Sequence, residues 1–87
     1  MPRTITLVYL ARLREAFGTG GEKIELPPEV GTVSALTHWL AARGGAWAAE
    51  LAPGRALRIA VNHDLAGGET PVATGDEIAL FPPVTGG

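Results

Sequence analysis

The fold of this chain is decided by one stretch, TVSALTHWLA, which occupies residues 32–41. Thr32 is suited to cap a helix, because its hydroxyl can accept a hydrogen bond from a backbone amide of the first turn. Apolar residues then recur near the helical period on one face: Val33, Leu36, Leu40 and Ala41. A glycine pair at positions 44 and 45 ends the pattern. The stretch therefore predicts one main helix whose apolar face needs a sheet to cover it.

Strands are predicted on both sides of this helix. Four segments have the composition of strands: residues 4–10, 22–26, 57–62 and 77–81. Short helical turns are expected over residues 11–17, where Gly18 follows as a stop, and over residues 46–51. Residues 65–71 are expected to be an irregular link without secondary structure.

The order of the main elements is strand, strand, helix, strand, strand, in a chain of 87 residues. The first two strands are closely joined, so they are expected to pair antiparallel. Placing the last strand beside the first gives a mixed sheet of four to five strands packed on one main helix. This is an α+β fold of the β-grasp, ubiquitin-like type. We expect a β-grasp domain over residues 1–81 and an extended C-terminal tail over residues 82–87.

Composition excludes several function classes. Seven basic residues stand against nine acidic ones, and no segment gathers the basic residues into a stripe, so no nucleic-acid partner is expected. The absence of cysteine excludes a disulfide scaffold, a thiolate zinc site and a cysteine nucleophile. No signal peptide or long apolar run is visible, so we expect a cytoplasmic protein without a membrane partner.

The side chains do not suggest a self-contained active site. His38 and His63 lie far apart in the sequence, and a metal site needs three or four converging ligands, so no metal is expected. Ser34 is the only serine and lacks the context of a nucleophile elbow. Three carboxylates are expected on the solvent face of an outer strand and loop: Glu22, Glu25 and Glu29.

The C-terminal segment is different in character. The last predicted strand ends at Phe81, and Pro82 and Pro83 then favour a stiff, extended chain. Two residues further on, Gly86 and Gly87 form a tip without side chains, which can pass where any Cβ would collide. Such a tail suits insertion into a narrow active site of another protein. The carboxylate of Gly87 is then the candidate reactive group, because a carboxylate can be activated as an acyl-adenylate.

The segment GDEIALFPPVTGG, residues 75–87, resembles the end of the small, sulfur-carrying subunit of molybdopterin synthase. Residues 7–15 are similar to the first strand and short helix of that family, and residues 61–65 resemble its third strand and the following loop. The resemblance runs nearly from end to end. It implies a β-grasp fold, in agreement with the order of the elements.

The resemblance also implies a sulfur-transfer cycle. A ubiquitin-activating-type adenylyltransferase uses ATP to adenylate Gly87, and sulfur from a donor protein replaces AMP to give a thiocarboxylate. The tail then enters the large synthase subunit, where sulfur passes to cyclic pyranopterin monophosphate to form molybdopterin. By the same resemblance, Gly86 permits passage, and four residues hold the tail extended: Pro82, Pro83, Val84 and Thr85. The family implies a heterotetramer of two small and two large subunits, no permanently bound cofactor, and catalytic side chains on the large subunit alone.

The docking surface can be predicted from strand alternation. If Ile78 and Leu80 point toward the helix, Phe81 points to the opposite face, at the root of the tail. An exposed phenylalanine is a natural interface anchor, and Leu10 and Leu65 are further candidates. The alternative is that these side chains only fill the small core.

Two other functions remain open. Sulfur carriers for thiamine, cysteine or tRNA thiolation share the fold and the glycine pair, although we do not expect Pro-Pro-Val-Thr before it in those relatives. A ubiquitin-like modifier would instead join its tail to lysine through an amide bond.

Overall fold

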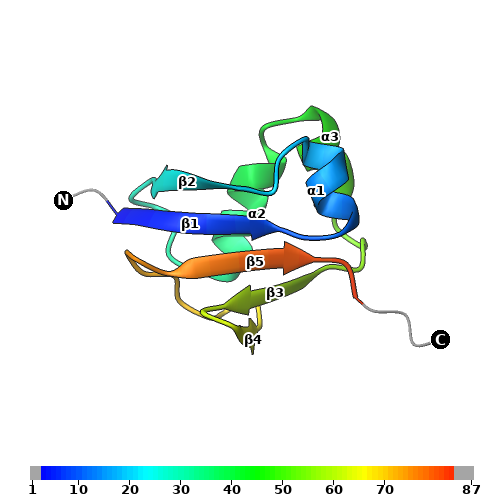
Figure 1. The fold of residues 1–87 in the computed structure, drawn as a ribbon. Helices are drawn as coiled ribbons and strands as arrows, with labels where there is room; N and C mark the ends of the chain where they lie inside the picture. The colour runs from blue at the N-terminus through cyan, green and yellow to red at the C-terminus, as the bar shows by residue number, and fades with distance from the viewer. Residues whose placement is uncertain (1–2, 84–87) are drawn as a thin grey trace.

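The computed structural model describes residues 3–83. They form a five-stranded mixed sheet with one main helix and two short helices packed against it (Figure 1). The strands are β1 (Arg3–Tyr9), β2 (Gly21–Leu26), β3 (Arg58–Val61), β4 (Asp64–Ala66) and β5 (Glu77–Phe81). The helices are α1 (Arg12–Phe17), α2 (Val33–Ala41) and α3 (Gly45–Glu50). The sheet order is β2-β1-β5-β3-β4, which confirms the β-grasp prediction.

The first and last strands lie side by side at the centre of the sheet and run parallel (Figure 1). Thr6 is paired with Glu77 and Tyr9 with Leu80. The amide of Leu10 donates to the carbonyl of Leu80 at 3.1 Å, which extends the ladder by one residue. Both strands therefore end at the same edge of the sheet, and the C-terminal tail starts there.

The core lies between one face of this sheet and α2. The side chains that are at most 1% exposed include Ile5, Leu7 and Tyr9 of β1, Ile78 and Leu80 of β5, and Leu36 and Leu40 of α2. Each such apolar side chain contributes roughly 1.5–3 kcal/mol through its removal from water. The core-facing placement predicted for Ile78 and Leu80 is therefore confirmed.

Two predicted helix ends are confirmed, the start of α2 and the end of α1, whereas α3 begins at Gly45, one residue before the predicted turn, and ends at Glu50, one residue before its predicted end. Thr32 is extended (φ −134°, ψ 165°), and its hydroxyl oxygen accepts a hydrogen bond from the Ala35 amide at 3.2 Å. This is the N-cap that the sequence indicates. At the end of α1, Gly18 adopts the left-handed conformation with φ 72°, which suits a residue without a Cβ.

The prediction of an irregular link over residues 65–71 is wrong at its start. Strand β4 pairs antiparallel with β3, so Leu65 lies in a strand opposite Ala60 and not in a loop. The chain reverses through Asn62 and His63, whose positive φ angles of 50° and 75° make the tight left-handed turn that hairpins favour. The Asn62 amide oxygen accepts from the Glu77 amide at 2.9 Å, which fixes this turn to β5. The second turn position holds histidine where glycine is usual, so the hairpin signal was missing.

Among residues 3–83, no helix has the length and apolar character that a bilayer crossing requires.

Candidate functional site at the root of the tail

The candidate site is the edge of the sheet where β5 gives way to Pro82 and Pro83. Both prolines are half-buried and lie outside the strand. The remaining tail residues with a predicted role, Val84, Thr85, Gly86 and Gly87, lie outside the residues that the structure describes. Their roles, and the division of the chain at residue 81, stay predictions.

The face of the sheet opposite α2 carries a row of apolar side chains that ends at the tail. Phe81 is half-buried on this face, whereas its neighbour Leu80 is 1% exposed on the core face. Within residues 3–83, two large apolar side chains are exposed: Leu10 at 44% and Leu65 at 73%. The predicted placement of Phe81, Leu10 and Leu65 outside the core is therefore confirmed for the two leucines and holds in part for the phenylalanine.

The strand register joins these side chains into one surface. Ala79 is paired with Val8 on one side and with Ala60 on the other, and Ala60 is paired with Leu65. We call the surface formed by Val8, Leu10, Ala60, Leu65, Ala79 and Phe81 the open-face patch. Leu10 and Leu65 are its exposed members, Val8, Ala79 and Phe81 are half-buried, and Ala60 is buried among them. Apolar residues that lie together on an open sheet face, with no helix to cover them, are typical of an interaction surface.

A strained turn shapes the edge of this patch. Ala11 has φ 52° and ψ −129°, and the Leu13 amide donates to the Leu10 carbonyl at 3.2 Å. This is a type II′ turn with alanine at the position that usually holds glycine. Such a conformation costs on the order of 1–3 kcal/mol, and it is found preferentially at functional sites. The turn leaves Leu10 exposed and starts α1 at Arg12.

A carboxylate joins two arginines beside the tail. Glu50 Oε1 accepts from Arg12 Nη2 at 2.7 Å and from Arg55 Nη2 at 3.1 Å. The Arg12 guanidinium, followed by that of Arg55, holds the pKa of Glu50 below its usual range. Both arginines line a groove of about 490 Å³ together with Pro82 and Pro83. Sequence reasoning missed Arg55 and Glu50, because residues distant along the chain meet here.

A second polar cluster stabilises the fold on the core-facing side of the sheet. The Tyr9 hydroxyl donates to Glu22 Oε2 at 2.6 Å, and Arg43 Nη1 donates to the same oxygen at 2.8 Å. The Arg43 guanidinium also lies 4.5 Å from the Trp47 ring centre, and Trp47 stacks on Phe17 at 3.7 Å. The prediction that Glu22 faces solvent is therefore wrong, because in β2 it shares the core-facing parity of Leu26.

The charges of this cluster shift its pKa values. Arg43 is the main cause that keeps the pKa of Glu22 below its usual range. Burial, followed by the bond to Glu22, raises the pKa of Tyr9 well above its usual value, so Tyr9 stays a neutral hydrogen-bond donor. The cluster therefore ties α1, α3 and the segment that follows α2 to the sheet.

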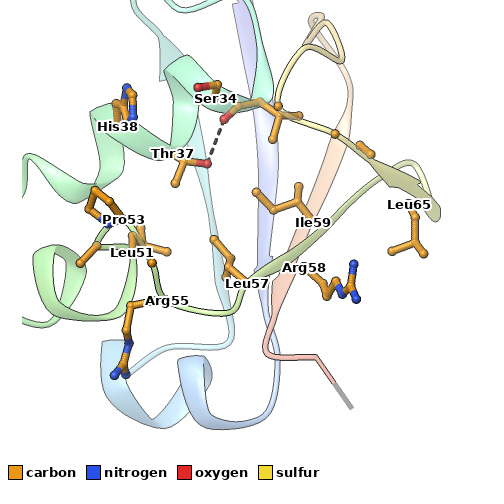
Figure 2. Close-up of a pocket in the computed structure, with 16 residues that line it drawn as sticks. Ser34, Thr37, His38, Leu51, Pro53, Arg55, Leu57, Arg58, Ile59 and Leu65 are labelled. Carbon is orange, nitrogen blue, oxygen red and sulfur yellow. Dashed lines mark hydrogen bonds between the residues drawn. The ribbon is translucent and has the colours of Figure 1, made fainter. Parts of the chain in front are cut away.

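The other polar candidates do not assemble a reactive site. His38 and His63 are both exposed, and His63 Nε2 lies 3.9 Å from Glu77 Oε2. A groove of about 440 Å³ lies between α2 and β3. The Thr37 hydroxyl, which lines it, donates to the carbonyl of Val33 in its own helix at 2.9 Å (Figure 2). Ser34 and His38 both line this groove. No hydrogen bond of the Ser34 hydroxyl is found among residues 3–83. Over residues 3–83, no three histidine, aspartate or glutamate side chains converge on a metal position.

Comparisons with known proteins agree with this geometry. The model of the ThiS family matches residues 7–87. The molybdopterin synthase sulfur carrier subunit of Escherichia coli is 41% identical over 95% of this chain and 99% of its own length. The corresponding subunit of Haemophilus influenzae is 40% identical over the same shares. A solved structure from Pyrococcus furiosus, described as a putative molybdopterin converting factor, subunit 1, is 26% identical, with a TM-score of 0.77 over 94% of this chain and 99% of its own.

Proposed function

The chain belongs to the ThiS family, and from this premise we propose that it is the sulfur carrier subunit of a molybdopterin synthase. The observation that carries the proposal is 41% identity to a subunit of that name, over 95% of this chain. The β-grasp fold and the open-face patch at the root of the tail support it. Under this proposal, the reactive atom belongs to the backbone of Gly87, and no side chain of this chain acts as a catalyst.

The proposed cycle has three steps. A carboxylate oxygen of Gly87 attacks the α-phosphorus of ATP on an activating enzyme, and pyrophosphate leaves. Sulfide-level sulfur supplied by a donor protein then attacks the acyl carbon, the bond from this carbon to the AMP oxygen breaks, AMP leaves, and a thiocarboxylate remains. Finally, the thiocarboxylate sulfur bonds to a carbon of cyclic pyranopterin monophosphate on the large subunit, and water cleaves the thioester between Gly87 and this sulfur, which returns Gly87 to a carboxylate. Two such transfers supply the two sulfur atoms of the dithiolene. The carrier itself binds no permanent cofactor, and ATP is consumed only in the first step.

The described residues would position the tail for these reactions. Docking through the open-face patch removes Phe81, Leu10 and Leu65 from water, and each contributes apolar contact area. The tail leaves the sheet directly after Phe81, so a partner that covers this patch also meets the start of the tail. Pro82 and Pro83 reduce the conformational freedom that insertion would otherwise cost. We further propose that two carriers and two large subunits assemble into a heterotetramer.

The intact mass of the protein tests the proposal. After incubation with the activating enzyme, ATP and a sulfur source, the mass should increase by the difference between sulfur and oxygen. A matched variant that lacks Gly86 and Gly87 should keep its mass and its thermal midpoint. An unchanged mass of the full-length chain would contradict the proposal, and conjugates to lysine side chains would favour a protein modifier instead.

A further inference from the structure

We propose that Arg12 and Arg55 form a basic docking site that receives carboxylate side chains of the large synthase subunit. The inference rests on the proposed function, because it needs a protein that receives the tail. It goes beyond that function by naming a charged recognition element next to the apolar patch.

The cluster of Arg12, Arg55 and Glu50 carries more positive than negative charge. Both guanidinium groups share one oxygen of Glu50, so two positive charges meet one negative charge. The Arg12 side chain is 58% exposed and that of Arg55 is 44% exposed, whereas Glu50 is 17% exposed. Each guanidinium carries five N–H donors, and most of them remain free for an added acceptor. The cluster therefore presents unused donors and a net positive charge toward solvent.

The cluster lies beside the start of the tail. Arg12 and Arg55 line the same groove as Pro82 and Pro83, where the tail departs. Arg58 lies nearby in the fold, because it is the cross-strand neighbour of Phe81. A protein that covers Phe81 and accepts the tail must approach these cations. Burying them without partners would be costly, so a specific partner should offer carboxylates there.

The distance between the arginines and the reactive end of the tail favours protein carboxylates, and not the phosphates of a nucleotide, as the groups that the arginines bind. Four residues lie between Pro83 and the end of Gly87, and an extended chain advances at most about 3.3–3.6 Å per residue. A fully extended tail therefore carries its reactive end up to about 13–14 Å beyond the prolines. Phosphates that react at the tip of the tail would be held by the partner's active site. The arginines instead face the partner's surface around the entrance of that site.

The rate of association with the large subunit of the same organism tests the proposal, measured at low and at high ionic strength. Replacing both arginines, Arg12→Gln with Arg55→Gln, should lower the association rate about tenfold at low salt, because electrostatic steering is lost. The same variant should lose most of its salt dependence. Lys23→Gln removes an exposed cation from β2, away from the tail, and should change neither quantity. Arg12→Lys with Arg55→Lys should retain most of the rate.

The outcomes distinguish this inference from the proposed function. If the glutamine variant behaves like the Lys23→Gln control while deletion of Gly86 and Gly87 still abolishes sulfur transfer, the inference is wrong and the function stands. If the variant impairs only adenylation by the activating enzyme and binds the large subunit normally, the arginines serve the nucleotide and the inference is again wrong. If the unaltered protein does not bind the large subunit, both fail. An unchanged thermal midpoint confirms that the variant is folded.

Discussion

Two neighbouring residues of β5 allow folding and docking to be separated. Leu80 is 1% exposed on the core face, and Phe81 is half-buried on the open face at the root of the tail. Leu80→Ala should cost about 2–5 kcal/mol of unfolding free energy, the range for a buried leucine. Phe81→Ala should cost only about 1–1.5 kcal/mol, because only the covered part of its ring loses contacts. If Phe81 anchors the partner, its removal should cost about 2 kcal/mol of binding, or roughly a thirtyfold increase in Kd.

Urea denaturation and calorimetric titration with the large subunit measure the two effects. Leu80→Ala should lower the unfolding free energy strongly, while the fraction that remains folded binds with nearly unchanged affinity. Phe81→Ala should show the reverse pattern. The face assignment is refuted if Phe81→Ala costs about 3–5 kcal/mol of stability, the range for a fully buried phenylalanine, and leaves Kd unchanged.

Three further predictions concern the stability of the fold. Glu22→Gln should lower the unfolding free energy at neutral pH by about 1–2 kcal/mol, because it removes a charged acceptor from Tyr9 and Arg43. Since the folded pKa of Glu22 is lowered, its contribution is present above its unfolded pKa and is lost as pH falls through the folded one. The variant should therefore lose less stability on acidification, and an equal loss in both proteins would contradict this. Ala11→Gly should raise the unfolding free energy by about 1 kcal/mol, because relief of strain exceeds the added chain entropy; a decrease would show that the turn is not strained. His63→Gly should raise the unfolding free energy by about 0.5–1 kcal/mol, because glycine adopts the φ of 75° at this position without strain. His63→Ala should not raise the unfolding free energy. Urea denaturation measures all of these changes.

The parts of the fold that follow local rules could be predicted from the sequence. The Thr32 cap, the apolar face of α2 and the alternation of Ile78 to Phe81 depend on neighbours within a few residues along the chain. The pairing of β1 with β5 followed from the order of the elements. The sequence indicates Leu10 and Leu65 as docking candidates, but it predicts an irregular link where Leu65 lies in β4.

The parts that the sequence did not predict depend on tertiary contacts or on unusual backbone angles. Glu22 looks like a solvent-facing residue until Arg43, 21 positions further on, provides its charged partner. The β3–β4 hairpin and the turn at Ala11 place non-glycine residues at positive φ, so they lack the usual glycine signal. Arg55 joins the tail root only because α3 brings Glu50 beside Arg12.

The central claim is that sulfur leaves this protein from its last residue to build molybdopterin, and a single-turnover transfer tests it most directly. The thiocarboxylated protein is mixed with the large subunit and cyclic pyranopterin monophosphate, and its intact mass is followed together with molybdopterin formation. We predict that the mass returns to that of the carboxylate form as molybdopterin forms, and that both changes require the large subunit and the precursor. A thiocarboxylate that persists in the complete mixture, with no molybdopterin formed, would contradict the claim.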